Sequence, residues 1–73
     1  MERVFQHDGD TCRIEARLEN DIWHVRAMRG EKQVGTAGRL PAAYRIDAEA
    51  LGEGDPLHLL VALFERRMRS GEI

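Results

Sequence analysis

The sequence predicts an α+β fold in which a four-stranded antiparallel meander precedes one C-terminal helix, and the helix packs on the apolar face of the sheet. Two observations predict it. Apolar and charged residues alternate along residues 11–28, which is typical of strands with one buried face. Residues 57–68 place apolar side chains at the spacing of an amphipathic helix. With 73 residues, the chain is expected to form a single domain, residues 1–73.

Turn dipeptides divide the first half of the chain into strands. Three dipeptides separate the runs: Asp8-Gly9, Asn20-Asp21 and Gly30-Glu31. Asp-Gly is a strong hairpin signal, Asn-Asp tolerates the positive φ angles of a type I′ turn, and a leading glycine suits type II′. The predicted strands are residues 2–7, 11–19, 22–29 and 32–37.

The register that follows from two-residue loops gathers the apolar side chains on one face. The expected pairs there are Phe5–Cys12, Ile14–Ala27, Ala16–Val25, Leu18–Trp23, Ala27–Val34 and Val25–Thr36. On the opposite face the register pairs Glu15 with Arg26, and Arg17 with His24. A one-residue slip would exchange the two faces, so the clean separation of apolar from charged residues supports this choice of turns.

The middle of the chain, from Thr36 to Gly54, allows more than one structure. Gly35 and Gly38 weaken a strand end, and Pro41 is unfavourable in a central strand. Residues 44–46 could form a short fifth strand, Asp47 could begin a single helical turn that runs through Leu51, or residues 40–51 could form a mobile loop.

The C-terminal helix, residues 55–70, has the clearest boundaries. Asp55 is a good N-cap, Pro56 suits the first helical position, and Gly71 suits the residue after the helix. The helix and sheet together give the predicted core: Phe5, Cys12, Ile14, Ala16, Leu18, Trp23, Val25, Ala27, Val34, Leu57, Leu60, Val61, Phe64 and Met68.

Leu59 and Leu63 widen the apolar side of this helix to about half of its circumference. A helix that covers one sheet in a monomer needs a narrower apolar stripe, so either residues 40–51 or a second subunit is expected to cover the excess. A chain of this size has a small core, and one cysteine cannot form an intramolecular disulfide. Leu59 and Leu63 are therefore the candidate self-association residues.

Basic side chains on the charged sheet face and at the helix end form a candidate contact surface. Its residues are Arg13, Arg17, His24, Arg26, Arg66, Arg67 and Arg69. A net charge of −2 argues against nucleic-acid binding through the overall field, and the predicted aromatic residues fall on the core face rather than beside these cations. A solvated face is the favoured interpretation, and nucleic-acid binding is the alternative.

No group of residues predicts catalysis, a cofactor or a metal. Cys12 lies on the apolar face without an obvious base, and the three histidines stand at unrelated positions. Residues 35–38 lack the pattern of a phosphate-binding loop. There is no apolar run long enough to cross a membrane and no signal segment, so a cytoplasmic location is expected.

These observations favour a small non-enzymatic protein-interaction module whose partner is a second copy of itself or another protein. The alternative is a nucleic-acid-binding module that uses the arginines of the sheet face and of the helix C-terminus.

Overall fold

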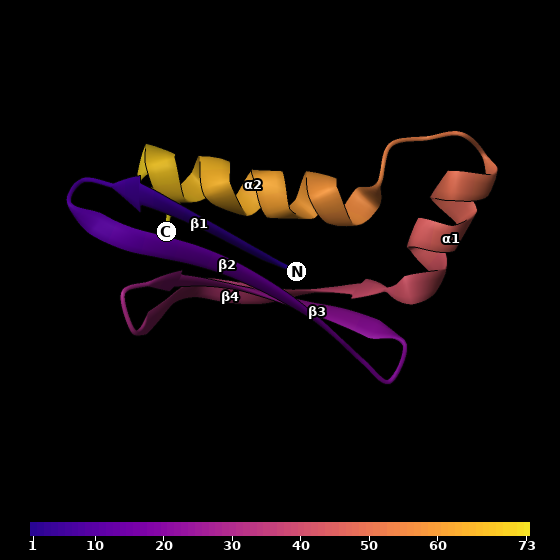
Figure 1. The fold of residues 1–73 in the computed structure, drawn as a ribbon, viewed down its shortest axis with the longest axis horizontal. Coiled ribbons are helices and arrows are strands. Elements are labelled where there is room, and N and C mark those ends of the chain that lie inside the picture. The colour runs from indigo at the N-terminus through magenta and orange to yellow at the C-terminus, as the bar shows by residue number, and fades with distance from the viewer.

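The computed structural model describes residues 1–73 and places four strands before two helices (Figure 1). The strands are β1 (Glu2–His7), β2 (Asp10–Glu19), β3 (Ile22–Arg29) and β4 (Lys32–Pro41). The helices are α1 (Ala42–Ala50) and α2 (Pro56–Ser70). The α+β class and the antiparallel sheet are confirmed. The expectation of a single C-terminal helix is wrong, because the middle segment forms a helix of its own.

The strands form one open sheet in sequence order, β1-β2-β3-β4, joined by the three predicted two-residue turns. At Asn20 and Asp21 both φ angles are positive, 52° and 61°, as a type I′ turn requires. Asp8 and Gly9 share this feature. At Gly30 only the first turn residue has a positive φ, which fits type II′. The turn chemistry of the sequence therefore sets the meander.

The predicted register is confirmed between β1, β2 and β3, including Phe5 opposite Cys12 and Leu18 opposite Trp23. One pair on β4 is wrong, because Val25 lies opposite Gly38 and not opposite Thr36. One residue separates Val25 from Ala27, whereas three separate their partners Gly38 and Val34. This β-bulge kinks an edge strand and interrupts its outward row of backbone hydrogen-bonding groups.

Two glycines let β4 continue past the predicted end at residue 37. Gly35 has a φ of 69°, and a Cβ atom there would lie 2.9 Å from Cγ2 of Ile73. A Cβ atom on Gly38 would lie 3.3 Å from Cε2 of Phe64. The strand passes close beneath α2 and ends at Pro41, where the end of an edge strand tolerates proline.

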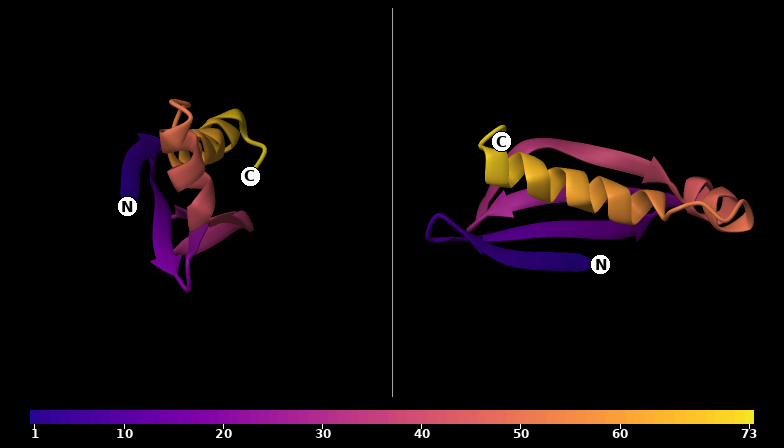
Figure 2. Two further views of the ribbon diagram at one scale, coloured as in Figure 1. Left: turned by 90° about the vertical axis from the view of Figure 1, so that its right-hand side faces the viewer. Right: turned by 90° about the horizontal axis from the view of Figure 1, so that it is seen from above.

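α2 covers one face of the sheet and leaves the other face open (Figures 1 and 2). The predicted caps are confirmed: the Asp55 carboxylate accepts a hydrogen bond from the backbone N–H of Leu57, and Gly71 takes the left-handed conformation. The ten clustered core residues come from β2, β3, β4 and α2. They are Cys12, Ile14, Ala16, Val25, Ala27, Leu40, Leu57, Val61, Phe64 and Met68.

Three residues depart from the predicted core. Leu18 is 49% exposed, because the tip of the β2–β3 hairpin curves away from α2 (Figure 1). Leu40 is buried because β4 extends further than expected. Met28 is buried on the charged face, between its strand neighbours Arg13 and Gln33, whose long side chains can cover it.

α1 replaces the three structures considered for the middle segment, which were a fifth strand, a single helical turn and a mobile loop. It stands at the end of the sheet and is joined to the start of α2 by a short loop (Figure 1). No residue of α1 is buried. Leu59 remains 66% exposed and Leu63 is half-buried, so α1 does not cover this side of α2.

Candidate functional site

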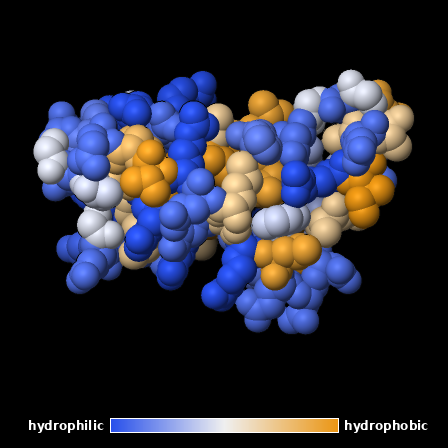
Figure 3. All heavy atoms as spheres, viewed as in Figure 1, coloured by the Kyte–Doolittle hydropathy of each residue, from blue (hydrophilic) through white to orange (hydrophobic).

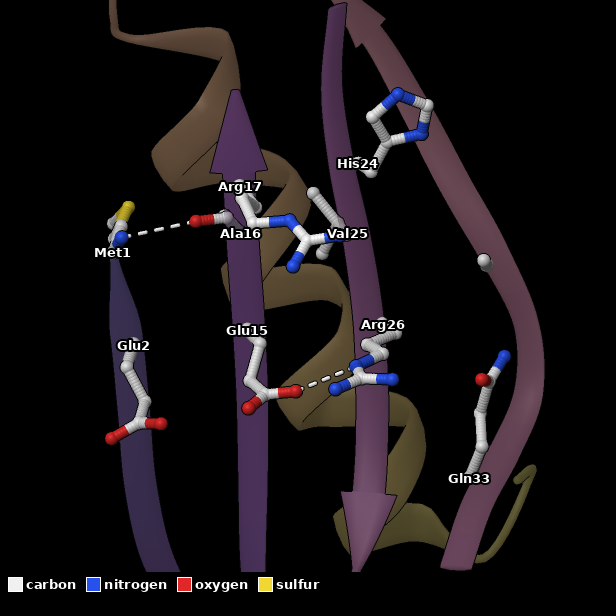
Figure 4. Close-up of a pocket in the computed structure, with 10 residues that line it drawn as sticks. Met1, Glu2, Glu15, Ala16, Arg17, His24, Val25, Arg26 and Gln33 are labelled. Carbon is white, nitrogen blue, oxygen red and sulfur yellow. Dashed lines mark hydrogen bonds and ion pairs between the residues drawn. The ribbon is translucent and has the colours of Figure 1, made fainter. Parts of the chain in front are cut away.

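The open face of the sheet carries the predicted charged side chains around a shallow cavity of about 440 Å³ (Figure 4). Figure 4 shows these side chains on one side of the strands and α2 on the other. The cavity is lined by Met1, Glu2, Glu15, Ala16, Arg17, His24, Val25, Arg26, Gln33 and Ala37. The Met1 amino group donates a hydrogen bond to the carbonyl oxygen of Ala16 at 3.0 Å.

Two of the candidate arginines on this face are held by glutamates. Arg26 Nε donates to Glu15 Oε1 at 2.6 Å, which confirms the cross-strand pair predicted from the register. Arg13 Nε lies 3.4 Å from Glu15 Oε2 and 3.9 Å from Glu2 Oε2. The positive and negative charges at the centre of the face therefore balance. The glutamates reduce the attraction of Arg13 and Arg26 for an anionic ligand.

A second group on the same face is cationic and nearly free of acidic partners. Arg17 lies opposite His24, and His24 lies opposite Arg39, so the three residues form one row across β2, β3 and β4. We call it the cationic row. Arg39 forms no ion pair, and Arg17 Nη2 reaches only Glu19, at 3.6 Å between two largely exposed side chains. Arg39 was not among the candidate residues, since its strand was expected to end earlier.

The remaining candidate arginines lie on α2, in the other layer of the molecule. Arg69 is bound to Glu65 at 2.8 Å and stacks on the Phe5 ring, 4.5 Å from its centroid. Arg67 lies 3.8 Å from Glu72, and Arg66 forms no ion pair. The structure does not bring these residues together with the arginines of the sheet face, so the seven predicted contact residues form two separate surfaces.

An exposed apolar surface follows α1 and the outer side of α2. In Figure 3 one orange group is visible at the upper edge near the start of α2, and other orange spheres lie at the right-hand end over α1, with hydrophilic residues between them. The exposed large apolar side chains of these two helices and their connection are Tyr44, Ile46, Leu51 and Leu59. Leu63 is half-buried and continues the stripe along α2. Both candidate self-association residues therefore belong to this surface, together with α1 residues that the sequence did not indicate.

Arg45 attaches α1 to the rest of the fold. Its Nε and Nη2 atoms donate to the two carboxylate oxygens of Asp55 at 3.0 and 2.7 Å, and its guanidinium lies 5.2 Å from the centroid of the Trp23 ring. The side-chain hydrogen bond from Arg45 lowers the pKa of Asp55, and the same bond raises the pKa of Arg45. Beside this contact lies a groove of about 530 Å³ that Leu18, Ile46 and Glu49 help to line.

The metal-ligating side chains and the single cysteine were also located in the fold. No group of three histidine, cysteine, aspartate or glutamate side chains is close enough to hold a metal ion. Cys12, the only cysteine, is fully buried. Neither helix is long and apolar enough to span a lipid bilayer.

No family model, curated protein or solved structure matches the chain. The function has to be inferred from two surfaces, the open sheet face with its cationic row and the apolar surface of α1 and α2.

Proposed function

We propose that the protein is a non-enzymatic interaction module that acts as a homodimer, and that the two copies join through α1 and the outer side of α2. The observation that carries the proposal is that α1 buries none of its residues, although Tyr44, Ile46 and the adjoining Leu51 are apolar. A nine-residue helix is too short to be stable alone in water. A partner surface would supply the packing that the monomer does not.

The charges around the surface favour a second copy as that partner. Asp47, Glu49 and Glu53 form no ion pairs at the α1 end, and Arg66 and Arg67 have free or weakly held charges towards the other end of α2. A two-fold interface must be self-complementary. An antiparallel pair of α2 helices, with the axis near Leu59, would bring Arg66 of each copy towards Glu53 of the other.

The size of the fold supports the same interpretation. Only 11 of 73 residues are buried, so the monomer has a small core for a chain that carries four exposed large apolar side chains on its helices and their connection. A standard interface hides about 800 Å² per partner, roughly a sixth of this molecule's 5033 Å². The exposed side of α2 and the whole of α1 together offer a surface of that kind.

Light scattering coupled to size exclusion tests the proposal. We expect a dimer at about 50 µM protein, and a shift towards monomer in Leu59→Glu, because a buried unpaired carboxylate costs several kcal/mol. Val4→Glu is the matched control, since Val4 is 55% exposed on β1 and lies away from the proposed interface. A wild-type protein that is monomeric at low and at high salt would show the proposal to be wrong.

A charge exchange tests the antiparallel arrangement separately. Arg66→Glu should weaken the dimer, because it places a carboxylate beside the acidic end of the second copy. Combining Arg66→Glu with Glu53→Arg should restore the dimer, since the two new side chains would again be of opposite sign. If the double variant is as weak as the single variant, the helices pair in another orientation.

A further inference from the structure

We propose that the open sheet face binds a phosphate monoester of nucleotide size, with the phosphate on the cationic row and the body of the ligand in the adjoining cavity. This site is independent of the proposed dimer, which uses the helices on the other side of the sheet. Nothing in the dimer proposal requires a ligand, and the two ideas can fail separately.

The spacing of the cationic row suits a phosphate group. Neighbouring strands are about 4.8 Å apart, so the side chains of Arg17, His24 and Arg39 start from points that span roughly 10 Å. Long arginine side chains can converge from the two ends on an anion above His24. A guanidinium offers paired N–H donors that match phosphate oxygens, and a histidine ring carries an N–H in either tautomer.

The charges of the row are available, which distinguishes it from the rest of the face. Arg39 forms no ion pair, and the contact of Arg17 with Glu19 is long and solvent-exposed, so a ligand would displace it at little cost. Arg13 and Arg26, by contrast, are held by Glu2 and Glu15. A phosphate monoester carries about −1.5 to −2 charges at pH 7, which two guanidinium groups can balance.

The cavity sets the size and polarity of the rest of the ligand. Arg17 and His24 line it at the row, and Glu15, Arg26 and Gln33 line it further along the face (Figure 4). The His24 ring lies between β3 and β4, and the Arg17 side chain extends from β2 towards β3 (Figure 4). At about 440 Å³, the cavity is within the range of small-molecule sites. Its carboxylate, amide and guanidinium groups suit a hydrogen-bonding body such as a nucleoside.

Amide chemical shifts of the uniformly ¹⁵N-labelled protein test the site with three probes: adenosine 5′-monophosphate, adenosine and inorganic phosphate. We expect the nucleotide to shift the amides of β2, β3 and β4 around the row and to saturate at millimolar concentrations. Adenosine should cause no saturable shift. Inorganic phosphate should shift the same amides more weakly, and equal affinity for phosphate would overturn the assignment of the cavity to the ligand body.

Variants connect the binding to the row. Arg39→Gln should weaken nucleotide binding about tenfold, because it removes a charge-assisted contact, and Arg17→Gln should do the same. Lys32→Gln is the matched control, since Lys32 is an unpaired cation near the β3–β4 turn and away from the row. An equal loss in the control, or no saturable shift with wild type, would overturn the proposal. So would a single-stranded oligonucleotide that binds far more tightly than the nucleotide and contacts α2 as well.

Discussion

The sheet with α2 and the helix α1 are held in place in different ways. α2 inserts Leu57, Val61, Phe64 and Met68 into a core shared with three strands, and all four side chains are buried. α1 has no fully buried residue and is attached through the contacts of Arg45 with Asp55 and Trp23 and through a hydrogen bond from the backbone N–H of Ala42 to the Asp21 carbonyl oxygen. Apolar burial contributes stability in proportion to the area removed from water and depends little on pH, whereas solvent-accessible ion pairs are weak and are screened by salt.

The contrast indicates that the molecule has two levels of stability. Elements with few buried contacts open at lower free energy than the core that supports them. We therefore expect α1 to detach while the sheet and α2 stay folded, unless a partner covers its apolar residues. The same region carries the proposed interface, so dimerisation and the ordering of α1 should be coupled.

Among the tests of this contrast, truncation of a buried side chain of α2 should have the largest effect on stability. Leu57→Ala should lower the free energy of unfolding by about 2–5 kcal/mol, because it leaves a cavity at a fully buried site. Leu59→Ala, two residues along the same helix, should change it by less than about 0.5 kcal/mol in the monomer. Urea titrations followed by circular dichroism would measure both. Equal losses of stability in the two variants would mean that the side of α2 that carries Leu59 is also packed against other residues.

The glycines that follow the two helices give a second comparison. Gly71 ends α2 with a φ of 82°, Gly52 follows α1 with a φ of 70°, and a Cβ atom would meet nothing within 4 Å at either site. Gly71→Ala should cost about 1 kcal/mol of global stability through backbone strain. Gly52→Ala imposes similar strain but should leave the urea midpoint of global unfolding nearly unchanged, because α1 is expected to unfold before the core. A comparable drop in both variants would show that α1 unfolds together with the core.

Removing the attachment of α1 should have a small and local effect. We expect Arg45→Gln to speed amide exchange in α1 by about two- to fivefold, and to leave exchange in β2 and β3 unchanged. Hydrogen-exchange mass spectrometry of separate peptides would resolve the two regions. Faster exchange throughout the sheet would contradict the division into two levels. Arg26→Gln is the control, since it removes an equally short ion pair on the sheet face.

The attachment should also depend on acidity, in a direction that the pKa of Asp55 determines. Because the folded protein lowers this pKa below its ordinary value of 3.8, the contact is fully present above about pH 4 and is lost as the pH falls further. The fluorescence of Trp23, the only tryptophan, would report the change through the neighbouring guanidinium. Asp55→Asn should show no such transition. If the Trp23 fluorescence of the wild-type protein stays constant as the pH falls while the core is still folded, this assignment is wrong.

The sequence predicted those parts of the fold that local chemistry determines. The three turns begin with residues that tolerate positive φ, and the alternation of apolar residues determines the register of β1, β2 and β3, so this part of the meander could be derived from the sequence alone. Asp55, Pro56 and Gly71 marked the limits of α2. These signals are specific because each one depends on the conformational preferences of one or two residues.

The rest of the fold depends on contacts between distant residues. The apolar residues of α1 are few and exposed, and the helix is attached by an ion pair to Asp55, whose only evident role in the sequence is that of a helix cap. The bulge in β4 was missed because two glycines also suggest a strand end. That bulge carries the strand on to Arg39, so the cationic row could be recognised only once the register of β4 was known.

The rate at which the buried Cys12 thiol is alkylated can report the opening of the core. The thiol sits within the core between the sheet and α2, with none of its surface exposed, and no other cysteine competes with it. An alkylating reagent can therefore react only when that core opens, at a rate proportional to the population of the open form. Detachment of α1 alone should leave the reaction unchanged. The alkylation rate of Cys12, measured with and without a nucleotide or at rising protein concentration, would then show which binding event stabilises the core.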